Sequence, residues 1–358
     1  MPSKATFDGL TSATEIAAAY SESVTGKTII VTGVSPDGLG LATASAFASQ
    51  RPERLILTGR SPEKIQASIS TLKAAYPGVQ YDALVMDLSS IASVRAAAAK
   101  IHEDSSIPTV NILVNNAGVM ALPDLQLSKD DVEMTFATNH VGHFLFTNLI
   151  LPKIIKAAET SSTPTRIINV SSYGHQFSPI RFSDINFRKI PAELPEEERP
   201  DLQKASFLTG EDWSDKSYVG FLSYGQSKTA NILFSVSLTQ KLEAKYGIKS
   251  YAIHPGAVIT NINRHAKPEE IEHALKRVKE LGFEAPAKTP DQGANSSVLS
   301  AVDPELPSPD LSSLESKGLY MADCKLDDEQ CAGFARNLEY ADKLWALSEE
   351  LVKEKFDI

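Results

Sequence analysis

The stretch Thr28-Ile29-Ile30-Val31-Thr32-Gly33-Val34-Ser35-Pro36-Asp37-Gly38-Leu39-Gly40 decides the fold. Its first four residues form a compact, largely β-branched apolar run, which is typical of a buried strand. Three glycines follow, and the Ala-rich segment Leu41–Gln50 then predicts a helix that ends before Pro52. Between a strand and a helix, glycines let backbone N–H groups and the helix N-terminus approach a pyrophosphate. The alternative is a plain turn with a Pro-Asp-Gly bend, and the flanking pattern makes it the weaker interpretation.

Strands and helices continue to alternate along the chain. Compact apolar runs predict strands at Arg54–Thr58, Tyr81–Met86, Asn111–Val114, Arg166–Val170, Lys249–Ile253 and Gly318–Met321. Periodicity and caps predict helices at Thr14–Tyr20, Ser61–Ala75, Ser89–Glu103, 128–149, 268–281, 291–302 and 336–355. This alternation predicts an α/β fold with a doubly wound parallel sheet that binds ligands at the carboxyl ends of its strands. We expect a lead-in at 1–26 and one domain at 27–358, with a C-terminal extension at about 303–358.

The composition argues against several classes of function. The 358 residues are 42% hydrophobic and 22% charged, which is typical of a soluble globular chain. A net charge of −10 argues against nucleic acid or an anionic membrane as partner. Cys324 and Cys331 are the only cysteines, so neither a metal site nor a disulfide framework is expected. Without a signal peptide pattern or an apolar run near the ~20 residues that span a bilayer, we expect a cytoplasmic protein.

A second stretch carries the chemistry. Ser223-Tyr224-Gly225-Gln226-Ser227-Lys228 predicts a helix, continuing to about Lys245, on which a tyrosine and a lysine share one face. A phenol titrates near ~10, and a neighbouring ammonium favours its anion, so Lys228 is expected to lower the pKa of Tyr224. Such a tyrosine can give or take a proton at cellular pH. The alternative is a chance spacing, although none of the other nine tyrosines has a lysine four residues later.

Residues 174–222 break the alternation just before this helix. The segment is rich in proline, carries the acidic run Glu196–Glu198, and contains scattered aromatic residues such as Phe177 and Trp213. A loop of this length inside a compact domain is usually functional or partly disordered. The aromatic residues favour packing over disorder. We therefore expect this insertion, together with the region after Gly256, to wall the substrate site, and we expect the insertion to be more mobile without ligand.

Taken together, these motifs resemble the short-chain dehydrogenase/reductase family, most closely its retinol-dehydrogenase-like branch and the longer fungal relatives of that branch. The resemblance covers roughly residues 26–265 and implies a Rossmann-type fold. The motifs follow the family order: Thr32–Gly40, Asp87, Asn115–Gly118, Asn139, Ser172, Tyr224 with Lys228, and Pro255–Gly256. The stretch 138–144, Thr-Asn-His-Val-Gly-His-Phe, is what favours the retinol-dehydrogenase-like branch.

Two features depart from the family pattern. The glycine loop usually has three residues between its first two glycines, whereas Val34–Asp37 makes four. The chain is also long enough to suggest the extended branch, which modifies sugar nucleotides. That branch has glycine where Pro36 stands here, and the extra length of this chain lies in 174–222 and the C-terminal tail.

The resemblance implies catalytic roles for four residues. Tyr224 would protonate a carbonyl oxygen in reduction or act as base in oxidation, and Lys228 would lower its pKa and hold the nicotinamide ribose. Ser172 would stabilise charge on the substrate oxygen, with Ser171 as a strand-end hydrogen bonder. Asn139 would hold a water that links Lys228 to solvent. The alternative for Asn139, nearly as strong from sequence, is a structural hydrogen bond to the backbone.

The resemblance also implies a nicotinamide dinucleotide cofactor. Gly33, Gly38 and Gly40 would line the pyrophosphate, Asp87 would face the adenine, and Asn115 and its neighbours the ribose side. The full implied set is Gly33, Gly38, Leu39, Gly40, Arg60, Asp87, Leu88, Asn115, Ala117, Gly118, Tyr224, Lys228, Pro255 and Gly256. The alternatives are a helix N-cap for Asp87 and a plain turn for Asn115–Gly118. Three nearby histidines, His140, His143 and His175, are expected to be packing or surface residues rather than ligands.

The end of the second strand favours NADP over NAD. That position faces the adenosine ribose, where a carboxylate would bind the 2′-hydroxyl of NAD. It reads Leu57-Thr58-Gly59-Arg60, with no carboxylate before Glu63, and Arg60 offers a charged fork suited to a phosphate. Lys64 adds positive charge from the next helix. The alternative for Arg60 is a solvated arginine at the start of that helix.

The sequence thus predicts an NADP(H)-dependent oxidoreductase that interconverts an apolar ketone or aldehyde and its alcohol. A non-catalytic NADP-binding scaffold or sensor is one alternative, disfavoured because Ser172, Tyr224 and Lys228 are all present. An isomerase or dehydratase that uses the same phenol is the other. The expected partner is a small-molecule substrate, and a homodimer is compatible with the sequence.

Overall fold

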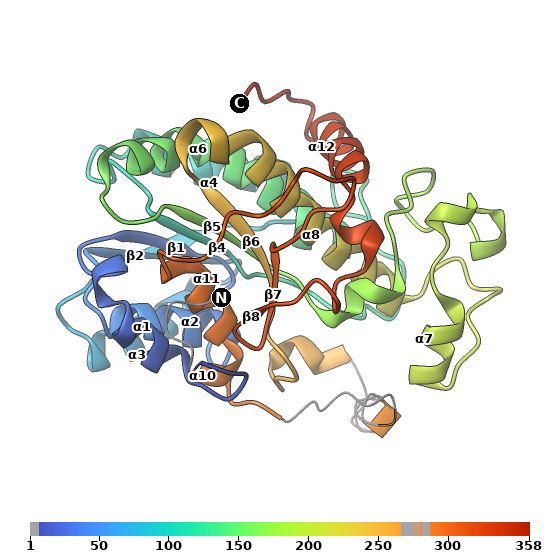
Figure 1. Cartoon of the computed structure of the whole chain (residues 1–358), viewed down its shortest axis with the longest axis horizontal. Helices are drawn as coiled ribbons and strands as arrows, with labels where there is room; N and C mark the ends of the chain where they lie inside the picture. The colour runs from blue at the N-terminus through green and yellow to red at the C-terminus, as the bar shows by residue number, and fades with distance from the viewer. Residues whose placement is uncertain (1–6, 266–275, 278–279, 281–286) are drawn as a thin grey trace.

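An eight-stranded sheet forms the centre of the molecule, in the order β3-β2-β1-β4-β5-β6-β7-β8 (Figure 1). The computed structural model describes residues 7–265, 276–277, 280 and 287–358. The strands are β1 Thr28–Val31, β2 Arg54–Gly59, β3 Gln80–Val85, β4 Ile112–Asn115, β5 Arg166–Val170, β6 Lys249–His254, β7 Tyr320–Ala322 and β8 Lys325–Leu326. Neighbouring strands are parallel except for β7 and β8. The doubly wound parallel sheet is confirmed, and its order reverses between β1 and β4, where such folds open a ligand crevice.

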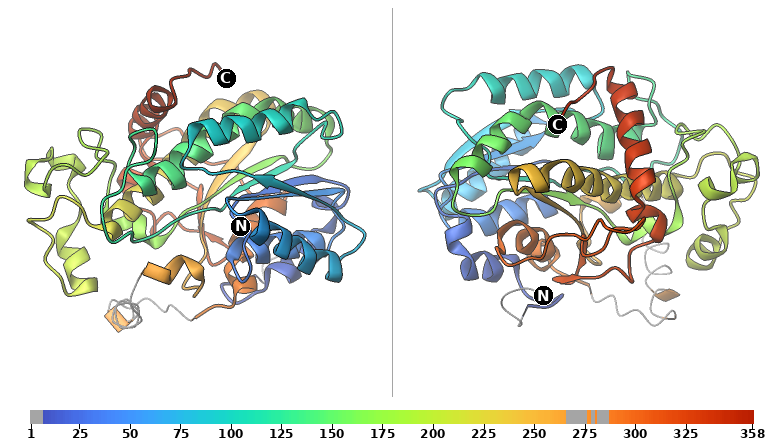
Figure 2. Two further views of the ribbon diagram at one scale, coloured as in Figure 1. Left: turned by 180° about the vertical axis from the view of Figure 1, so that it is seen from behind. Right: turned by 45° about the horizontal axis from the view of Figure 1, so that its top comes forward.

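Helices cover both faces of the sheet, as Figures 1 and 2 show. On one face lie α4 (Ile91–Glu103), α6 (Gly142–Thr160), α8 (Gly220–Tyr246) and α12 (Leu338–Val352). On the other lie α1 (Ala13–Ala19), α2 (Leu39–Ala48), α3 (Pro62–Ala75), α10 (Pro290–Gly293) and α11 (Asn295–Val302). Alternate strand residues feed the two cores, so that Ile30 faces the α4–α6–α8 layer while Ile29 and Val31 face the α1–α2–α11 layer. Ser61 caps α3, as the sequence predicts, by accepting from the N–H of Lys64 at 3.2 Å.

The helix expected at 128–149 is displaced along the chain. It begins with α5 (Met134–Phe136), passes through the π-helical turn η2 (Ala137–Val141), and ends with α6 at Thr160. It starts late because the carboxylate of Glu133 accepts from two first-turn N–H groups at 3.0 and 2.8 Å, which makes Glu133 the N-cap. It continues past Pro152 because the helix buries Leu151 and Ile154 in the core, which outweighs the missing backbone donor. The helix expected at 268–281 lies, apart from 276, 277 and 280, outside the described residues.

The lead-in and the insertion differ in where they pack. The lead-in from Phe7 onward, with α1, buries its apolar side chains in the same core as β1 and α2. The insertion instead builds a small core of its own from Phe177, Phe187, Ala205, Trp213 and Leu222, with α7 (Leu202–Thr209) on it. In both views of Figure 2 it projects beyond the sheet.

A buried ion pair organises this insertion. The guanidinium of Arg181 lies 2.5 Å from the carboxylate of Asp184 and 4.2 Å from the ring centre of Phe187. The pair also bonds to backbone, since Arg181 donates to the carbonyl of Lys189 at 2.5 Å. A buried charge pair whose two terminal guanidinium nitrogens also bond to backbone carbonyls favours one arrangement of a loop.

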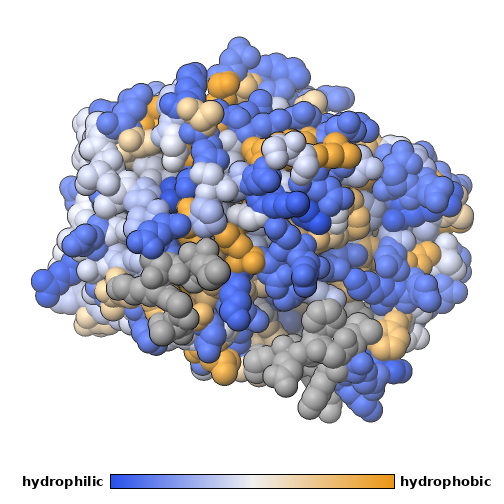
Figure 3. Space-filling model, in the orientation of Figure 1, coloured by the Kyte–Doolittle hydropathy of each residue, from blue (hydrophilic) through white to orange (hydrophobic). Residues whose placement is uncertain are grey.

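The exterior is mainly polar on the face drawn in Figure 3, where apolar side chains appear as small, separate spots. Among the described residues, no helix combines the length and the apolar character that crossing a bilayer requires.

Candidate active site

The glycine loop between β1 and α2 forms a close backbone cradle. Gly33 has φ +72°, and a Cβ there would lie 2.6 Å from the Cα of Ala117, so only glycine fits. The extra residue of the loop is absorbed by a turn. The N–H of Gly38 donates to the carbonyl of Ser35 at 3.1 Å, with Pro36 second and Asp37 third at φ +59°. Proline followed by a left-handed residue is the pattern of a type II turn, so the longer loop still delivers its last glycines to the N-terminus of α2.

Ser172, Tyr224 and Lys228 come together although they lie on different elements. Ser172 follows the end of β5 and the other two lie one turn apart on α8. The hydroxyl of Ser172 accepts from the N–H of Gly174 at 3.1 Å and also shares a hydrogen bond with the phenol of Tyr224. The ammonium of Lys228 donates to the carbonyl of Val170 at 2.8 Å and lies 5.5 Å from the centre of the Tyr224 ring.

Burial sets the protonation of this group. It raises the pKa of Tyr224 to about 12, with the Ser172 hydrogen bond acting in the opposite direction, and lowers the pKa of Lys228 to about 7. The sequence-based expectation of a lowered tyrosine pKa is therefore wrong for this structure. Removing both groups from water penalises both charges, and the ammonium points to a backbone carbonyl. A reactive phenolate accordingly needs further positive charge, or a substrate oxygen that takes its proton.

A cavity of about 620 Å³ lies above these residues and the cradle. Most of the residues implied by the family resemblance line it: Gly33, Gly38, Leu39, Gly40, Arg60, Leu88, Ala117, Gly118, Ser172, Tyr224, Lys228, Pro255 and Gly256. The N-terminus of α2 faces this cavity, and backbone N–H groups at a helix start favour an anion. A Cβ on Gly40 would lie 2.7 Å from the carbonyl oxygen of Gly33, so a cradle of this closeness fits a pyrophosphate in contact with backbone.

The charges on the cavity wall have one sign. Its described lining residues include Arg60, Lys64, Lys228 and Arg264, and none of them is an aspartate or a glutamate. This is a local excess of positive charge in a chain whose net charge is −10. Such a site favours an anionic ligand.

Three of the implied residues, Asn115, Asp87 and Asn139, do not line the cavity. Asn115 is buried below it, where its amide donates to Asn169 at 2.9 Å and Thr147 at 3.1 Å. The carboxylate of Asp87 accepts from the N–H and the hydroxyl of Ser89 at 3.0 and 2.8 Å, while Ser90 is the N-cap of α4.

Asn139 holds the wall of the cavity from behind. Its side chain accepts from the N–H of Val119 at 2.8 Å and donates to that residue's carbonyl at 3.0 Å. It also donates to the hydroxyl of Ser227, next to Lys228, at 2.9 Å. In this structure Asn139 therefore makes the backbone bonds of the structural alternative. Ser171 likewise bonds to backbone, donating to the carbonyl of Lys228 at 2.8 Å.

The region after Gly256, which the sequence analysis places in the wall of the site without naming residues, does line the cavity. Residues 257–264, including the first part of the short 3-10 helix η6 (Asn261–His265), line the cavity, and Ile259 is 69% exposed at its mouth. The side chain of Asn261 reaches the carbonyl of Pro36 in the glycine loop at 3.4 Å. None of the described lining residues comes from 174–222, so the expectation that this insertion walls the cavity is wrong for this structure; the insertion packs on a small core of its own. The only available signal for 257–264 was their position, directly after the Pro-Gly turn that ends β6.

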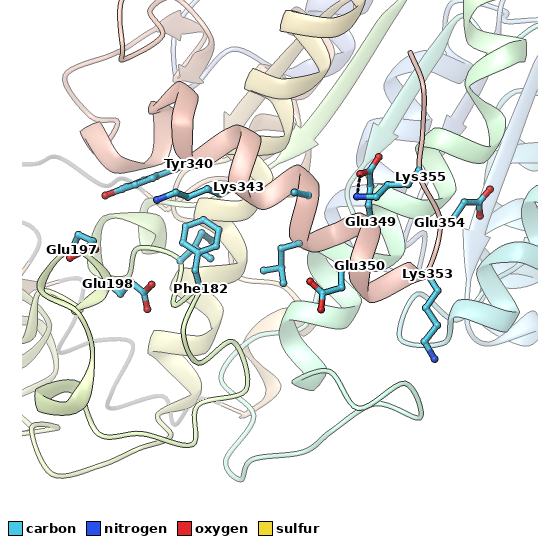
Figure 4. Close-up of a pocket in the computed structure, with 13 residues that line it drawn as sticks. Phe182, Glu197, Glu198, Tyr340, Lys343, Glu349, Glu350, Lys353, Glu354 and Lys355 are labelled. Carbon is cyan, nitrogen blue, oxygen red and sulfur yellow. Dashed lines mark hydrogen bonds and ion pairs between the residues drawn. The ribbon is translucent and has the colours of Figure 1, made fainter.

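A second hollow of about 780 Å³ lies between α12 and the insertion (Figure 4). Its walls mix glutamates such as Glu197 and Glu350 with lysines such as Lys343, around Phe182 and Tyr340. It shares no lining residue with the first cavity and contains neither Tyr224 nor Lys228. The chemistry of the three catalytic candidates therefore belongs to the first cavity.

The three nearby histidines are buried parts of the framework. His140 shares a hydrogen bond with Ser348 of α12 at 2.7 Å, and His175 receives the N–H of Ala332 at 3.1 Å. His143 contacts Thr32 and Asn139. In the part of the chain that the structure describes, no group of three or more His, Cys, Asp or Glu residues is placed to hold a metal ion.

Comparison with known proteins agrees with this geometry. The short chain dehydrogenase family model matches residues 27–183. The oxidoreductase fscI of Fusarium equiseti is 40% identical over 250 residues, covering 70% of this chain and 94% of its own. Human retinol dehydrogenase 13 is 34% identical over 331 residues, covering 92% of this chain and 85% of its own. A crystal structure of an uncharacterised Mycobacterium paratuberculosis protein aligns with TM-score 0.61 and 27% identity, covering 93% of this chain and 96% of its own. The chain therefore belongs to the short-chain dehydrogenase/reductase family, oxidoreductases that act on carbonyl and alcohol substrates with a nicotinamide dinucleotide.

Proposed function

We propose that the protein is an NADP(H)-dependent oxidoreductase that interconverts an apolar ketone or aldehyde and the corresponding alcohol. One observation carries the proposal. A single cavity holds Ser172, Tyr224 and Lys228 at one end, and the glycine cradle with Arg60 at the other. The first end suits proton transfer to a carbonyl oxygen, and the second suits the phosphates of a dinucleotide.

The residues of this chain divide the chemistry among them. The bound dinucleotide would supply or accept the hydride. Tyr224, which burial keeps protonated, gives its phenol proton to the carbonyl oxygen during reduction. The hydroxyl of Ser172 is fixed by the N–H of Gly174 and orients the same substrate oxygen. Lys228, with its pKa near 7, can return a proton to the tyrosine at cellular pH.

Arg60 and Lys64 support NADP as the cofactor. Both line the cavity, Arg60 directly after β2 and Lys64 in the first turn of α3. The nearest carboxylate in sequence, Glu63, is not among the described lining residues and accepts from the hydroxyl of Ser61 at 2.7 Å. A guanidinium fork with no carboxylate among the described lining residues favours a ribose 2′-phosphate over a 2′-hydroxyl.

Apolar side chains in the cavity lining support an apolar substrate. Met120, Val258, Ile259 and Ile262 are among the lining residues. Apolar walls with a few polar groups at one point are the usual form of a site that orients a small molecule by its single polar atom.

A panel of carbonyl and alcohol compounds tests the proposal, with nicotinamide absorbance read in NADPH and in NADH. We expect turnover of aliphatic or aromatic carbonyls with NADPH, and a markedly higher kcat/KM than with NADH. Product without any net change in the cofactor would instead identify an isomerase or dehydratase. Tight NADPH binding without product from any compound would identify a scaffold or sensor.

A further inference from the structure

His143 lies between the cofactor cradle and the catalytic residues. It is 1% exposed, and both of its ring nitrogens have partners. Nε2 lies 2.8 Å from the hydroxyl of Thr32, and Nδ1 lies 2.9 Å from the carbonyl oxygen of Asn139. Thr32 directly follows β1, and Asn139 lies in the π-helical turn η2, so one imidazole ring joins the two halves of the site.

The partners determine which nitrogen carries the proton. A carbonyl oxygen can only accept, so Nδ1 of His143 must donate to Asn139. Nε2 is then the acceptor, and the single hydrogen of the Thr32 hydroxyl points to it rather than to the carbonyl of Val114, which is 3.4 Å away. Burial lowers the pKa of His143 to about 4 and the positive charge of Lys228 acts in the same direction, so the ring is neutral.

Thr32 transmits this contact to the wall of the cavity. While its hydroxyl donates to His143, it accepts from the N–H groups of Asn116 and Ala117 at 2.9 and 3.0 Å. Ala117 lies against Gly33 of the cradle, and both line the cavity. Losing the acceptor on His143 frees the Thr32 hydroxyl to rotate toward Val114, which loosens two of the bonds that hold this wall.

Asn139 receives the other contact. Its carbonyl is held by His143 while its side chain holds Val119 and the hydroxyl of Ser227. A Cβ on Gly118 would lie 3.3 Å from the Asn139 side chain and 3.6 Å from Nζ of Lys228, which shows how closely these groups meet. A shift of the π-helical turn therefore moves the wall beside Lys228.

We propose that His143 is a positioning residue, a neutral Nδ1–H imidazole whose Thr32 contact sets the cofactor cradle and whose Asn139 contact sets the catalytic residues. The two contacts act on different measured quantities. The Thr32 contact governs affinity for the dinucleotide, and the Asn139 contact governs the rate of the chemical step. The second half of this statement rests on the proposed function, and the first does not.

Two substitutions separate the contacts. In His143→Gln the side-chain oxygen replaces Nε2 as acceptor for Thr32 and the donor to Asn139 is lost. In His143→Asn the amide nitrogen replaces Nδ1 as donor to Asn139 and the acceptor for Thr32 is lost. A lost buried hydrogen bond corresponds to roughly a tenfold effect. We expect His143→Gln to lower kcat about tenfold with little change in the NADPH dissociation constant, and His143→Asn to raise that constant about tenfold.

The same pair of substitutions at His140 is the matched control. His140 lies in the same turn and is equally buried, but it bonds to Ser348 of α12. Both His140 variants should change thermal stability. Neither should change kcat while leaving the NADPH dissociation constant unchanged, or the reverse. If the two His143 variants change both quantities in parallel, as the His140 variants do, His143 is only a packing residue and the proposal fails.

A measurement on the wild-type protein decides the case where one of the two His143 variants does not fold. The chain has seven histidines, so ¹⁵N-labelled imidazole spectra can be assigned by comparison with the His143 variant that does fold. We expect His143 as the Nδ1–H tautomer, unchanged from pH 6 to 8. An Nε2–H tautomer, or a protonated ring in this range, overturns the proposal whether or not a substrate has been found.

Discussion

Replacing Lys228 with methionine should stabilise the protein in the absence of cofactor while abolishing turnover. Burial lowers the pKa of Lys228 from 10.5 to about 7. At ~1.4 kcal/mol for each unit of pKa, burying Lys228 lowers the free energy of unfolding by about 4 to 5 kcal/mol at pH 7. Methionine has a similar length and no charge. The carbonyl of Val170 keeps a partner, because the amide of Asn231 donates to it at 2.9 Å. We expect a net gain of about 2 to 4 kcal/mol in unfolding free energy at pH 7.

The gain should depend on pH in a defined direction. The pKa of Lys228 is lower in the folded chain, so between about pH 7 and 10.5 the unfolded chain binds more protons at this residue. Stability therefore rises with pH, by at most ~1.4 kcal/mol per pH unit from this group. The penalty is complete below pH 7 and absent above 10.5. The advantage of Lys228→Met over wild type should accordingly shrink from pH 7 to 9.

Urea unfolding of both proteins at pH 6, 7, 8 and 9 measures this difference directly. Buried phenols and thiols titrate at higher pH and are common to both proteins, so they cancel in the comparison. Lys245→Met, an exposed lysine on the same helix, is the matched control and should show no such pH dependence. A Lys228→Met protein that is less stable than wild type at pH 7, or whose difference stays constant with pH, would refute the reasoning.

Further predictions address the cofactor, the proton path and the insertion. Tyr224→Phe should abolish turnover and leave NADPH affinity nearly unchanged, because the ring still packs; a residual rate above a small fraction of wild type contradicts its role. Arg60→Ala should raise the dissociation constant of NADPH at least tenfold more than that of NADH, measured by fluorescence titration, whereas Lys73→Ala at the far end of α3 should not. Equal effects on both dissociation constants would contradict the assignment of Arg60 to the 2′-phosphate. Gly33→Ala should lose dinucleotide binding, since φ +72° and the 2.6 Å approach to Ala117 exclude a Cβ; calorimetry that finds unchanged affinity contradicts the cradle. Residues 174–222 contribute none of the described lining residues, so their hydrogen-exchange protection should change little when cofactor and substrate are added; a clear gain of protection would instead show that the insertion closes over the site.

Local signals in the sequence predicted most of the fold. The apolar run Thr28–Val31 is a strand in the structure with the same bounds, and so is Arg166–Val170. Such runs are buried on both faces, so their composition alone is distinctive. Ser61 is an N-cap because a hydroxyl bonds to an N–H three residues later, which needs no distant partner. The four-residue spacing of Tyr224 and Lys228 likewise fixes their common face on any helix.

What the sequence could not determine depends on contacts between distant residues. The upward shift of the Tyr224 pKa follows from burial under several elements, and the spacing of two residues in the sequence does not reveal that burial. Asn115 belongs to an Asn-Asn-Ala-Gly motif, yet only the neighbouring strand β5 and α6 decide that its amide points inward. The late start of the helix at Met134 depends on a carboxylate buried by the fold.

The sequence by itself thus determined the order of strands and helices, the glycine loop and the tyrosine–lysine pair, because each is encoded within a few neighbouring residues. The tertiary structure alone decided which residues after Gly256 line the cavity, and that 174–222 contributes none of the described lining residues. It also decided that His143 joins Thr32, which is 111 residues away, to Asn139. The physical reason is that burial, charge and hydrogen-bond partners are properties of neighbours in space, and the folded chain chooses those neighbours only when its layers pack together.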